Sequence, residues 1–230
     1  MKIAVVTGAS SGMGREFVRQ LGYFYRSLDE IWVIARRRER LEELRELSRI
    51  PIRIFEGNLI KKQVYRELSC ALEEEQPDIR MLVNAAGFGK SGSVEKIASE
   101  ELRAQTDMVD LNCRALTRMT LFCLPYMSRG SRIVNLASAA AFCPQPGFAV
   151  YAATKSAVSS MVKTLAAELA PYGIRVNGYI PGVINTDLNH ALIAEKGDQL
   201  RGAIAMQTFG EAIDVAWAMA FLASDYARYI

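Results

Sequence analysis

The chain has 230 residues, half of them apolar, and its 28 Lys and Arg against 25 Asp and Glu leave a formal net charge of +3. This composition excludes a disordered or collagen-like chain, and so small a net charge gives no indication of nucleic-acid binding. No apolar stretch approaches the roughly 18–20 residues of a membrane span, and the apolar start of the chain is too short for a signal peptide. The four cysteines form no C-x-x-C pair and there is one histidine, which predicts free thiols in a cytoplasmic protein and no metal site.

Short apolar runs alternate along the chain with longer amphipathic stretches. In chain order the pattern predicts a strand at 3–6, a glycine-rich turn at 8–14, a helix at 15–27, a strand at 31–34, a helix at 37–48, a strand at 52–55, a helix at 63–75, a strand at 81–83, a helix at 99–127 with Ser99 as its cap, a strand at 133–136, a helix at 151–170, a strand at 174–180 and a helix at 211–224. Strands that are apolar throughout and alternate with helices are typical of a parallel sheet covered on both faces. We therefore expect one α/β domain over residues 1–230, a Rossmann-type doubly wound parallel sheet of about six strands.

The turn after the first strand reads Thr7-Gly8-Ala9-Ser10-Ser11-Gly12-Met13-Gly14 and leads into a helix. Glycines permit positive φ and a close approach of the backbone to a ligand, and the free amides at a helix N-terminus attract phosphate. A dinucleotide pyrophosphate therefore fits this turn, and the alternative is a plain tight turn without a ligand. The residues expected at the cofactor are Gly8, Ser10, Ser11, Gly12, Met13 and Gly14.

The end of the second predicted strand selects between the two nicotinamide cofactors. NAD binding usually places a carboxylate there, on the ribose 2′-hydroxyl, whereas an arginine accommodates the 2′-phosphate of NADP. This strand runs into Arg36, Arg37 and Arg38, and the nearby acidic residues precede the strand. We therefore favour NADP(H), with Arg36 as the main contact assisted by Ser10 or Arg37, and keep NAD(H) as the alternative. A solvated helix start with ion pairs such as Arg38–Glu42 would explain the basic run without a ligand.

Four polar residues suggest carbonyl chemistry. Tyr151 and Lys155 are four residues apart and share one face of a predicted helix. A tyrosine hydroxyl can donate a proton to a carbonyl oxygen, and a nearby ammonium would lower the pKa of that hydroxyl from its usual value near 10. Tyr and Lys at this spacing also occur by chance. Ser138 follows the fifth strand, where it can act as a second donor, and Asn112 lies inside a predicted helix at a cost in helix propensity.

With these residues in their order and spacing, the sequence resembles the short-chain dehydrogenase/reductase family. The matching pieces run from residue 7 to residue 186. They are Thr7-Gly8-(x)3-Gly12-x-Gly14, Asn84-Ala85-Ala86-Gly87, Asn112, Ser138, Tyr151-(x)3-Lys155 and Pro181-Gly182-(x)3-Thr186. The resemblance implies an oxidoreductase that interconverts a ketone and a secondary alcohol by hydride transfer.

The resemblance also implies a role for each matched residue. Tyr151 would be the general acid in reduction and the base in oxidation, Lys155 would lower its pKa and hold the nicotinamide ribose, Ser138 would orient the carbonyl, and Asn112 would hold a water in a proton relay. The cofactor would further contact Asn84, Ala85, Ala86, Gly87, Pro181, Gly182, Val183 and Thr186. Where the family usually has an aspartate on adenine, this chain has Asn58, followed by Leu59, so a weakened contact is expected there.

The substrate is less well determined by the sequence. The expected lining comes from residues 88–94, 139–150 and 187–209, the last as a mobile lid. The middle segment is mostly small and apolar, which favours an apolar ketone or secondary alcohol. The stretch 172–188 resembles the 3-oxoacyl-carrier-protein reductases, and Arg129 could receive an acidic carrier, but Tyr172 stands where a second basic residue is expected. A generic carbonyl reductase or hydroxysteroid-type dehydrogenase therefore ranks equally with an oxoacyl reductase. A non-catalytic NADP(H)-binding protein and an epimerase or dehydratase are the remaining alternatives.

The predicted helices at 99–127 and 151–170 carry more apolar surface than one sheet face requires. In the family these helices pair across a two-fold axis, so a homodimer or homotetramer is expected. The family's last helix is followed by a strand that closes the sheet edge, and this chain ends at Ile230 where that strand would start. We therefore expect the last edge strand to be absent.

Overall fold

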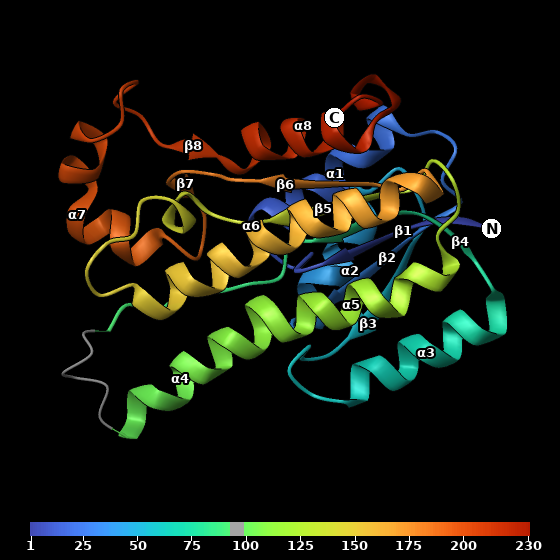
Figure 1. Cartoon of the computed structure of the whole chain (residues 1–230), viewed down its shortest axis with the longest axis horizontal. Coiled ribbons are helices and arrows are strands. Elements are labelled where there is room, and N and C mark those ends of the chain that lie inside the picture. Colours follow the sequence, from blue (N-terminus) through green and yellow to red (C-terminus); the bar gives the residue numbers. More distant parts are fainter. Residues whose placement is uncertain (93–98) are drawn as a thin grey trace.

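The computed structural model describes residues 1–92 and 99–230, and its centre is a sheet of six parallel strands (Figure 1). The strands stand in the order β3-β2-β1-β4-β5-β6, so the chain builds one half of the sheet outward from β1 and the other half outward from β4. Their bounds are Lys2–Thr7 (β1), Glu30–Ala35 (β2), Ile52–Glu56 (β3), Asp78–Asn84 (β4), Arg132–Leu136 (β5) and Arg175–Tyr179 (β6). The expected single doubly wound domain is confirmed, and the carboxyl ends of all its strands meet at one edge of the sheet.

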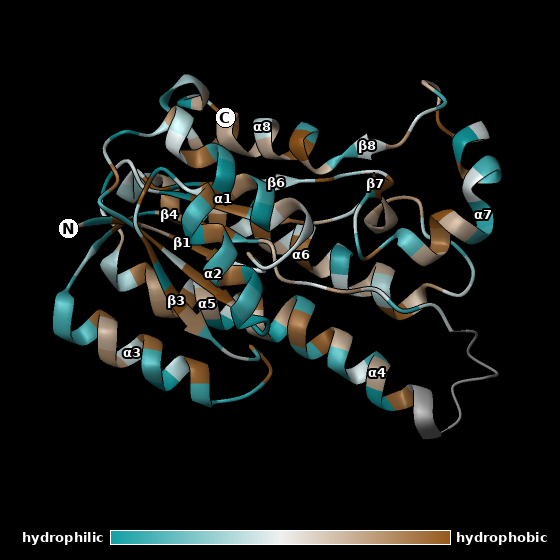
Figure 2. Cartoon of the chain, turned by 180° about the vertical axis from the view of Figure 1, so that it is seen from behind, coloured by the Kyte–Doolittle hydropathy of each residue, from teal (hydrophilic) through white to brown (hydrophobic). Residues whose placement is uncertain are grey.

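Helices cover both faces of this sheet. On one face lie α1 (Gly12–Phe24), α2 (Arg38–Leu47) and α8 (Ala212–Ala223). On the other lie α3 (Gln63–Glu75), α5 (Leu116–Cys123) and α6 (Ala149–Leu169), with α4 (Ser99–Val109) against α6. Successive strand residues alternate between the layers, because Ala4 and Val6 join the first core and Ile3 and Val5 join the second. Figure 2 shows the hydrophobic strands at the centre and the largely hydrophilic surface of α2.

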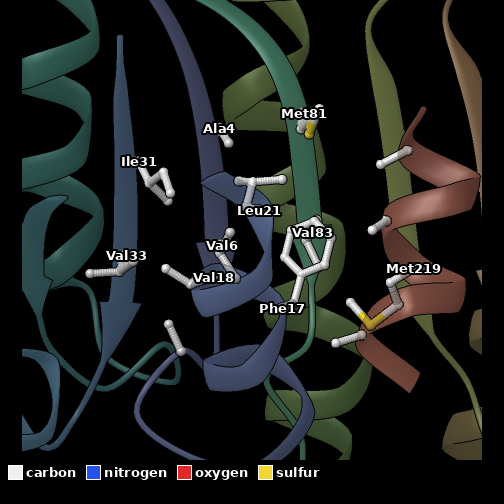
Figure 3. Packing of buried hydrophobic residues seen from close by; sticks show 14 of the residues in the cluster. Ala4, Val6, Phe17, Val18, Leu21, Ile31, Val33, Met81, Val83 and Met219 are labelled. Carbon is white, nitrogen blue, oxygen red and sulfur yellow. The ribbon is translucent and has the colours of Figure 1, made fainter. Parts of the chain in front are cut away.

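The core on the first face centres on α1. Phe17, Val18 and Leu21 project from this helix and are fully buried. Figure 3 shows Phe17 among residues of the central strands and Met219 of α8, which belong to the same cluster. This packing holds the N-terminal end of α1, and the glycine turn before it, against the sheet.

The long helix expected at 99–127 is divided in the structure. After α4 a π-helical segment spans Asp110–Ala115, and α5 is followed by a 3-10 turn at Leu124–Tyr126. The second position of that turn is a proline, whose missing amide ends a regular helix. The capping role expected of Ser99 concerns side chains that lie outside the described residues.

Two short strands that the sequence did not suggest bracket the expected lid. β7 (Ile184–Asn185) pairs in parallel with β8 (Gly210–Glu211), and α7 (His190–Gly202) lies between them in the chain. Ile184 is buried in the core, whereas α7 has no buried residue. The lid segment is therefore attached at its base and lies outside the core (Figure 1).

β6 forms one edge of the sheet. Beyond α8 the chain forms a 3-10 turn at Asp225–Ala227, and Arg175 of β6 donates hydrogen bonds to the main-chain oxygens of Leu222 (2.9 Å) and Ser224 (2.7 Å). Within the described residues no strand lies outside β6, as expected. Across the ranges 1–92 and 99–230, no helix is both long and apolar enough to cross a membrane.

Replacing Phe17 tests the importance of the α1 core. Phe17→Ala removes a fully buried ring, so we expect the free energy of unfolding to fall by about 3–5 kcal/mol, measured by urea denaturation. Phe24→Ala is the matched control, since Phe24 ends the same helix with 54% of its surface exposed, and it should change that free energy by less than about 1 kcal/mol. Equal losses in the two variants would contradict the packing described above.

Candidate active site

A cleft opens at the carboxyl edge of the sheet, between the glycine turn, the ends of β2 and β4, the loop after β3 and the base of the lid. Thirteen of the residues expected at the cofactor line it. They are Gly8, Ser10, Ser11, Gly12, Met13, Gly14, Arg36, Asn58, Leu59, Ala85, Ala86, Gly87 and Thr186. The structure thus brings together segments that are up to 178 residues apart, from Gly8 to Thr186.

The glycine turn fits a phosphate-bearing cofactor. Gly8 has φ +72°, and a Cβ on it would lie 2.7 Å from the Ala86 amide nitrogen, so no larger residue fits there. A Cβ on Gly14 would likewise lie 2.7 Å from the Gly8 carbonyl oxygen. The Ser11 side chain makes no capping hydrogen bond, which leaves the first amides of α1 available to an anion at the cleft.

Arginines gather where β2 ends at the cleft. Both Arg36 and Arg37 line it, and the Arg37 guanidinium donates to the Ser10 hydroxyl oxygen at 3.3 and 3.4 Å. Arg36 is exposed and makes no ion pair within the described residues. Arg38 instead pairs with Glu42 at 3.1 Å, as the sequence suggested for that residue. The donors present therefore suit an anionic group at this end of the cleft.

Several of the expected cofactor residues do not line this cleft. Asn84 is buried beneath it and donates to the Asn135 side-chain oxygen at 2.8 Å, so it joins β4 to β5. Residues 181–183 lie beyond the described lining, where Pro181 accepts a hydrogen bond from the Ala139 amide at 3.1 Å and Gly182 borders open space. Asn58 does line the cleft, but its side-chain oxygen already accepts from the Ile60 amide at 3.0 Å.

Asn112 lies in the π-helical segment, which accounts for its place in the middle of a predicted helix. The Asn112 side chain accepts from the Phe88 amide (3.1 Å) and donates to the Phe88 carbonyl oxygen (2.9 Å) and the Thr154 hydroxyl (3.1 Å). π-helical turns of this kind occur frequently at functional sites. Asn112 thereby ties the loop after β4 to α6, next to Lys155.

Lys155 is buried beside Asn112, with 6% of its surface exposed. Its amine donates to the Leu136 carbonyl oxygen at the end of β5, at 2.8 Å. A Cβ on Gly87 would lie 3.0 Å from the Asn112 side-chain oxygen and 3.5 Å from the Lys155 amine, so the cleft reaches both through a glycine. Burial lowers the pKa of the amine to about 8, against a smaller opposing effect of Cys113.

Tyr151 lies one turn before Lys155 on α6. Its ring packs against Gly89, on which a Cβ would lie 3.0 Å away, and meets Phe148 edge-on with ring centroids 6.3 Å apart. Burial raises the pKa of the hydroxyl, and a hydrogen bond with the Ser138 side chain lowers it in part. Ser138 itself begins a 3-10 turn and accepts from the Ala140 amide at 3.2 Å.

The expectation that Lys155 lowers the pKa of Tyr151 is wrong for this structure. The Lys155 amine is 5.9 Å from the centre of the Tyr151 ring and is directed to the Leu136 carbonyl oxygen. Burial therefore sets the direction of both pKa shifts, since it disfavours the phenolate of Tyr151 and the ammonium of Lys155 alike. What the pair offers is a neutral phenol beside an amine that exchanges its proton close to neutral pH.

The cleft also has lining residues that the sequence analysis did not assign to the cofactor. They are Ile34, Ala35, Gly57, Leu111, Asp187 and Leu188. Asp187 forms ion pairs with Arg40 at 2.6 Å and with Arg37 at 3.5 Å, and these arginines hold the pKa of its carboxyl below the usual value. A pairing across 147 residues has no signal in one sequence, although an acid beside the lid and a basic run after β2 carry complementary charges.

Comparison with known proteins places these features in a family. A family model described as short chain dehydrogenase matches residues 2–197. The chain is 33% identical to the 3-oxoacyl-[acyl-carrier-protein] reductase FabG of Staphylococcus epidermidis, over 100% of this chain and 94% of the relative. It resembles the structure of a short-chain dehydrogenase/reductase, glucose/ribitol dehydrogenase from Brucella melitensis (TM-score 0.89, 26% identity, 100% and 91% of the chains). A 3-ketoacyl-(acyl-carrier-protein) reductase from Brucella melitensis, complexed with NADH, has a TM-score of 0.85 at 29% identity over 100% and 93% of the chains.

The buried amine of Lys155 should make stability depend on pH. Its pKa is lower in the folded chain, about 8, than the ordinary 10.5, so the unfolded chain binds more protons between these values and stability rises with pH there. The free energy of unfolding of wild type minus that of Lys155→Met should therefore increase by about 2–3 kcal/mol from pH 7 to pH 10, measured by chemical denaturation.

Lys163→Met, an exposed position on the same helix, serves as the control, and the corresponding difference should stay flat. A flat difference for Lys155→Met as well would show that the amine is not desolvated.

Proposed function

Because the chain belongs to the short-chain dehydrogenase/reductase family, whose members are NAD(P)-dependent oxidoreductases acting on CH–OH and keto groups, we propose that it interconverts a small apolar ketone and its secondary alcohol, with NADP(H) favoured. The observation that carries the proposal is the grouping of Tyr151, Ser138, Asn112 and buried Lys155 at the strand ends beside the cleft. A protein that only binds the cofactor has no evident need for all four.

Each residue has a task in this reaction. NADPH, when bound, supplies the hydride. The neutral Tyr151 hydroxyl donates the proton to the carbonyl oxygen, and the Ser138 hydroxyl donates a second hydrogen bond that positions this oxygen. Lys155 returns a proton to Tyr151, since an amine with a pKa of about 8 exchanges readily at neutral pH. Asn112 keeps the loop after β4 and α6 in register around that amine.

The cofactor preference rests on the charges at the end of β2. Arg36 and Arg37 line the cleft there, and Glu30 at the opposite end of β2 accepts a hydrogen bond from Trp32. A carboxylate for a ribose 2′-hydroxyl is thus missing from the end of β2, and two guanidinium groups stand in its place. The Brucella reductase named above was solved with NADH, so use of NAD(H) stays the alternative for this chain.

The surroundings of Arg129 favour a free ketone over an acyl group on a carrier protein. This residue donates to the Pro171 carbonyl oxygen at 3.3 Å and packs against Gly173, and the neighbouring Tyr172 is 67% exposed. An acidic carrier protein would meet one guanidinium folded onto its own turn and an uncharged ring. A free apolar ketone is therefore our first choice, and a 3-oxoacyl group on a carrier, which the similarity to the oxoacyl reductase supports, is the second candidate.

The lid, the assembly and the compartment complete the proposal. The segment 187–209 covers the substrate as a lid, supported by the lack of buried residues in α7. A homodimer or homotetramer is supported by exposed apolar side chains on α4 and α5, where Leu102, Val109 and Leu121 are 55%, 44% and 61% exposed. A location in the cytoplasm is supported by the free cysteines. The residues 93 and 94 expected in the substrate lining lie outside the described residues.

Removing the Tyr151 hydroxyl tests the mechanism. Tyr151→Phe should lower kcat for ketone reduction by about 10²–10⁴-fold, the contribution of a positioned general acid, in a steady-state assay of NADPH oxidation with a ketone panel. The NADPH dissociation constant, measured by fluorescence titration, should change less than about threefold, because the hydroxyl and not the ring is removed. Tyr172→Phe is the control and should retain kcat. A Tyr151→Phe variant with substantial activity would refute the mechanism.

Arg36 tests the cofactor assignment. Arg36→Ala should raise the NADPH dissociation constant by about ten- to a hundredfold, the range of a lost charged hydrogen bond, and leave that of NADH nearly unchanged. Arg38→Ala is a matched control, because Arg38 pairs with Glu42 and does not line the cleft. Equal losses of both cofactors in Arg36→Ala would contradict a contact with the 2′-phosphate.

A further inference from the structure

Asp187 is placed so that it links the base of the lid to the arginines at the end of β2. It follows Thr186, whose methyl carbon would be 3.3 Å from a Cβ on Gly12, so the segment passes close to the glycine turn. From there the Asp187 carboxylate reaches Arg40, in the first turn of α2, and Arg37, the residue before α2. The link thus spans the two sides of the cleft, which Arg37 and Asp187 both line.

The two ion pairs differ in strength, and this difference decides what the link can do. One oxygen of Asp187 is 2.6 Å from Arg40 but 3.5 Å from Arg37, and Arg37 at the same time donates to the Ser10 hydroxyl. All three charged side chains are 39–58% exposed, so each pair is screened by solvent and weak. Arg37 therefore makes only weak contacts with Asp187 and Ser10, and a more strongly charged anion can displace Asp187 from it.

Resting on the proposed function, we infer that Asp187 reduces the discrimination between cofactors with and without a 2′-phosphate. Its carboxylate competes with the 2′-phosphate for Arg37, and Arg40 limits this competition by holding the carboxylate away. A phosphate carries more charge and more acceptor oxygens than a carboxylate, so it takes Arg37 and leaves Asp187 on Arg40. A nucleotide with a free 2′-hydroxyl does not compete for Arg37 and leaves the Asp187–Arg37 ion pair intact.

Substitutions of Asp187 and of Arg40 are expected to change the affinity for a 2′-phosphate in opposite directions. Asp187→Asn removes the competing charge and should tighten binding of a 2′-phosphate. Arg40→Gln frees the carboxylate to close on Arg37 and should weaken that binding. Because the second effect acts through Asp187, adding Asp187→Asn to Arg40→Gln should recover more affinity than Asp187→Asn gains in the wild-type background. A structural role for the ion pair alone would not produce this pattern.

The test uses 2′,5′-ADP and 5′-AMP as probes of the adenosine end, with dissociation constants from isothermal titration calorimetry at low salt, where exposed charges act most strongly. We expect Asp187→Asn to bind 2′,5′-ADP about three- to tenfold more tightly and 5′-AMP within twofold of wild type, and Arg40→Gln to bind 2′,5′-ADP at least threefold more weakly. Asp198→Asn is the charge-matched control, since Asp198 pairs with Arg201 within α7, and it should change neither constant.

The outcomes separate this inference from the cofactor proposal. A wild-type chain that binds both nucleotides equally would contradict the preference for NADP(H) and, with it, the inference. A wild-type preference for 2′,5′-ADP that Asp187→Asn leaves unchanged or reduces would overturn the role of Asp187 alone. Additive effects of Asp187→Asn and Arg40→Gln would likewise overturn the role of Arg40, because independent sites add.

Discussion

The buried amine of Lys155 is the constraint around which the candidate site is organised. Taking an ammonium out of water is costly, and a chain retains it only where hydrogen bonds and function compensate. Here the amine donates to the last carbonyl oxygen of β5, and α6 delivers it there while carrying Tyr151 one turn earlier. The position of the phenol thus depends on the same helix and strand end that satisfy the amine.

Two residues next to this amine, Gly87 and Asn112, leave room for it and hold the surrounding chain. Gly87 is the residue between the cleft and the Lys155–Asn112 pair, and a Cβ there would crowd the Asn112 side-chain oxygen, 3.0 Å away. Asn112 holds the loop after β4 with both ends of its amide, from a π-helical turn of the kind that is frequent at functional sites.

Much of this arrangement could be predicted from the sequence, and the part that could not has a common physical origin. Apolar strands alternating with amphipathic helices predict the doubly wound sheet, and the glycine turn and Tyr151–Lys155 spacing predict the site, because these signals are local. The predicted lowering of the Tyr151 pKa is wrong, because the direction of that shift depends on burial and on where the Lys155 amine points. The π-helical segment, β7 with β8 and the ion pairs of Asp187 depend on contacts between distant residues, which no short window contains.

The base of the lid shows how exposed and buried interactions divide their tasks. Ile184 anchors this segment in the core, and Asn189 donates to its carbonyl oxygen at 2.9 Å, so the attachment combines a buried apolar contact with a hydrogen bond. Beyond it α7 has no buried residue, and what holds the segment to the opposite side of the cleft is charge on exposed side chains. Such pairs are weak enough to exchange partners when an anion enters, whereas a buried contact would resist it. Under the proposed function, a lid joined this way can respond to the charge of a bound cofactor without a change in the core.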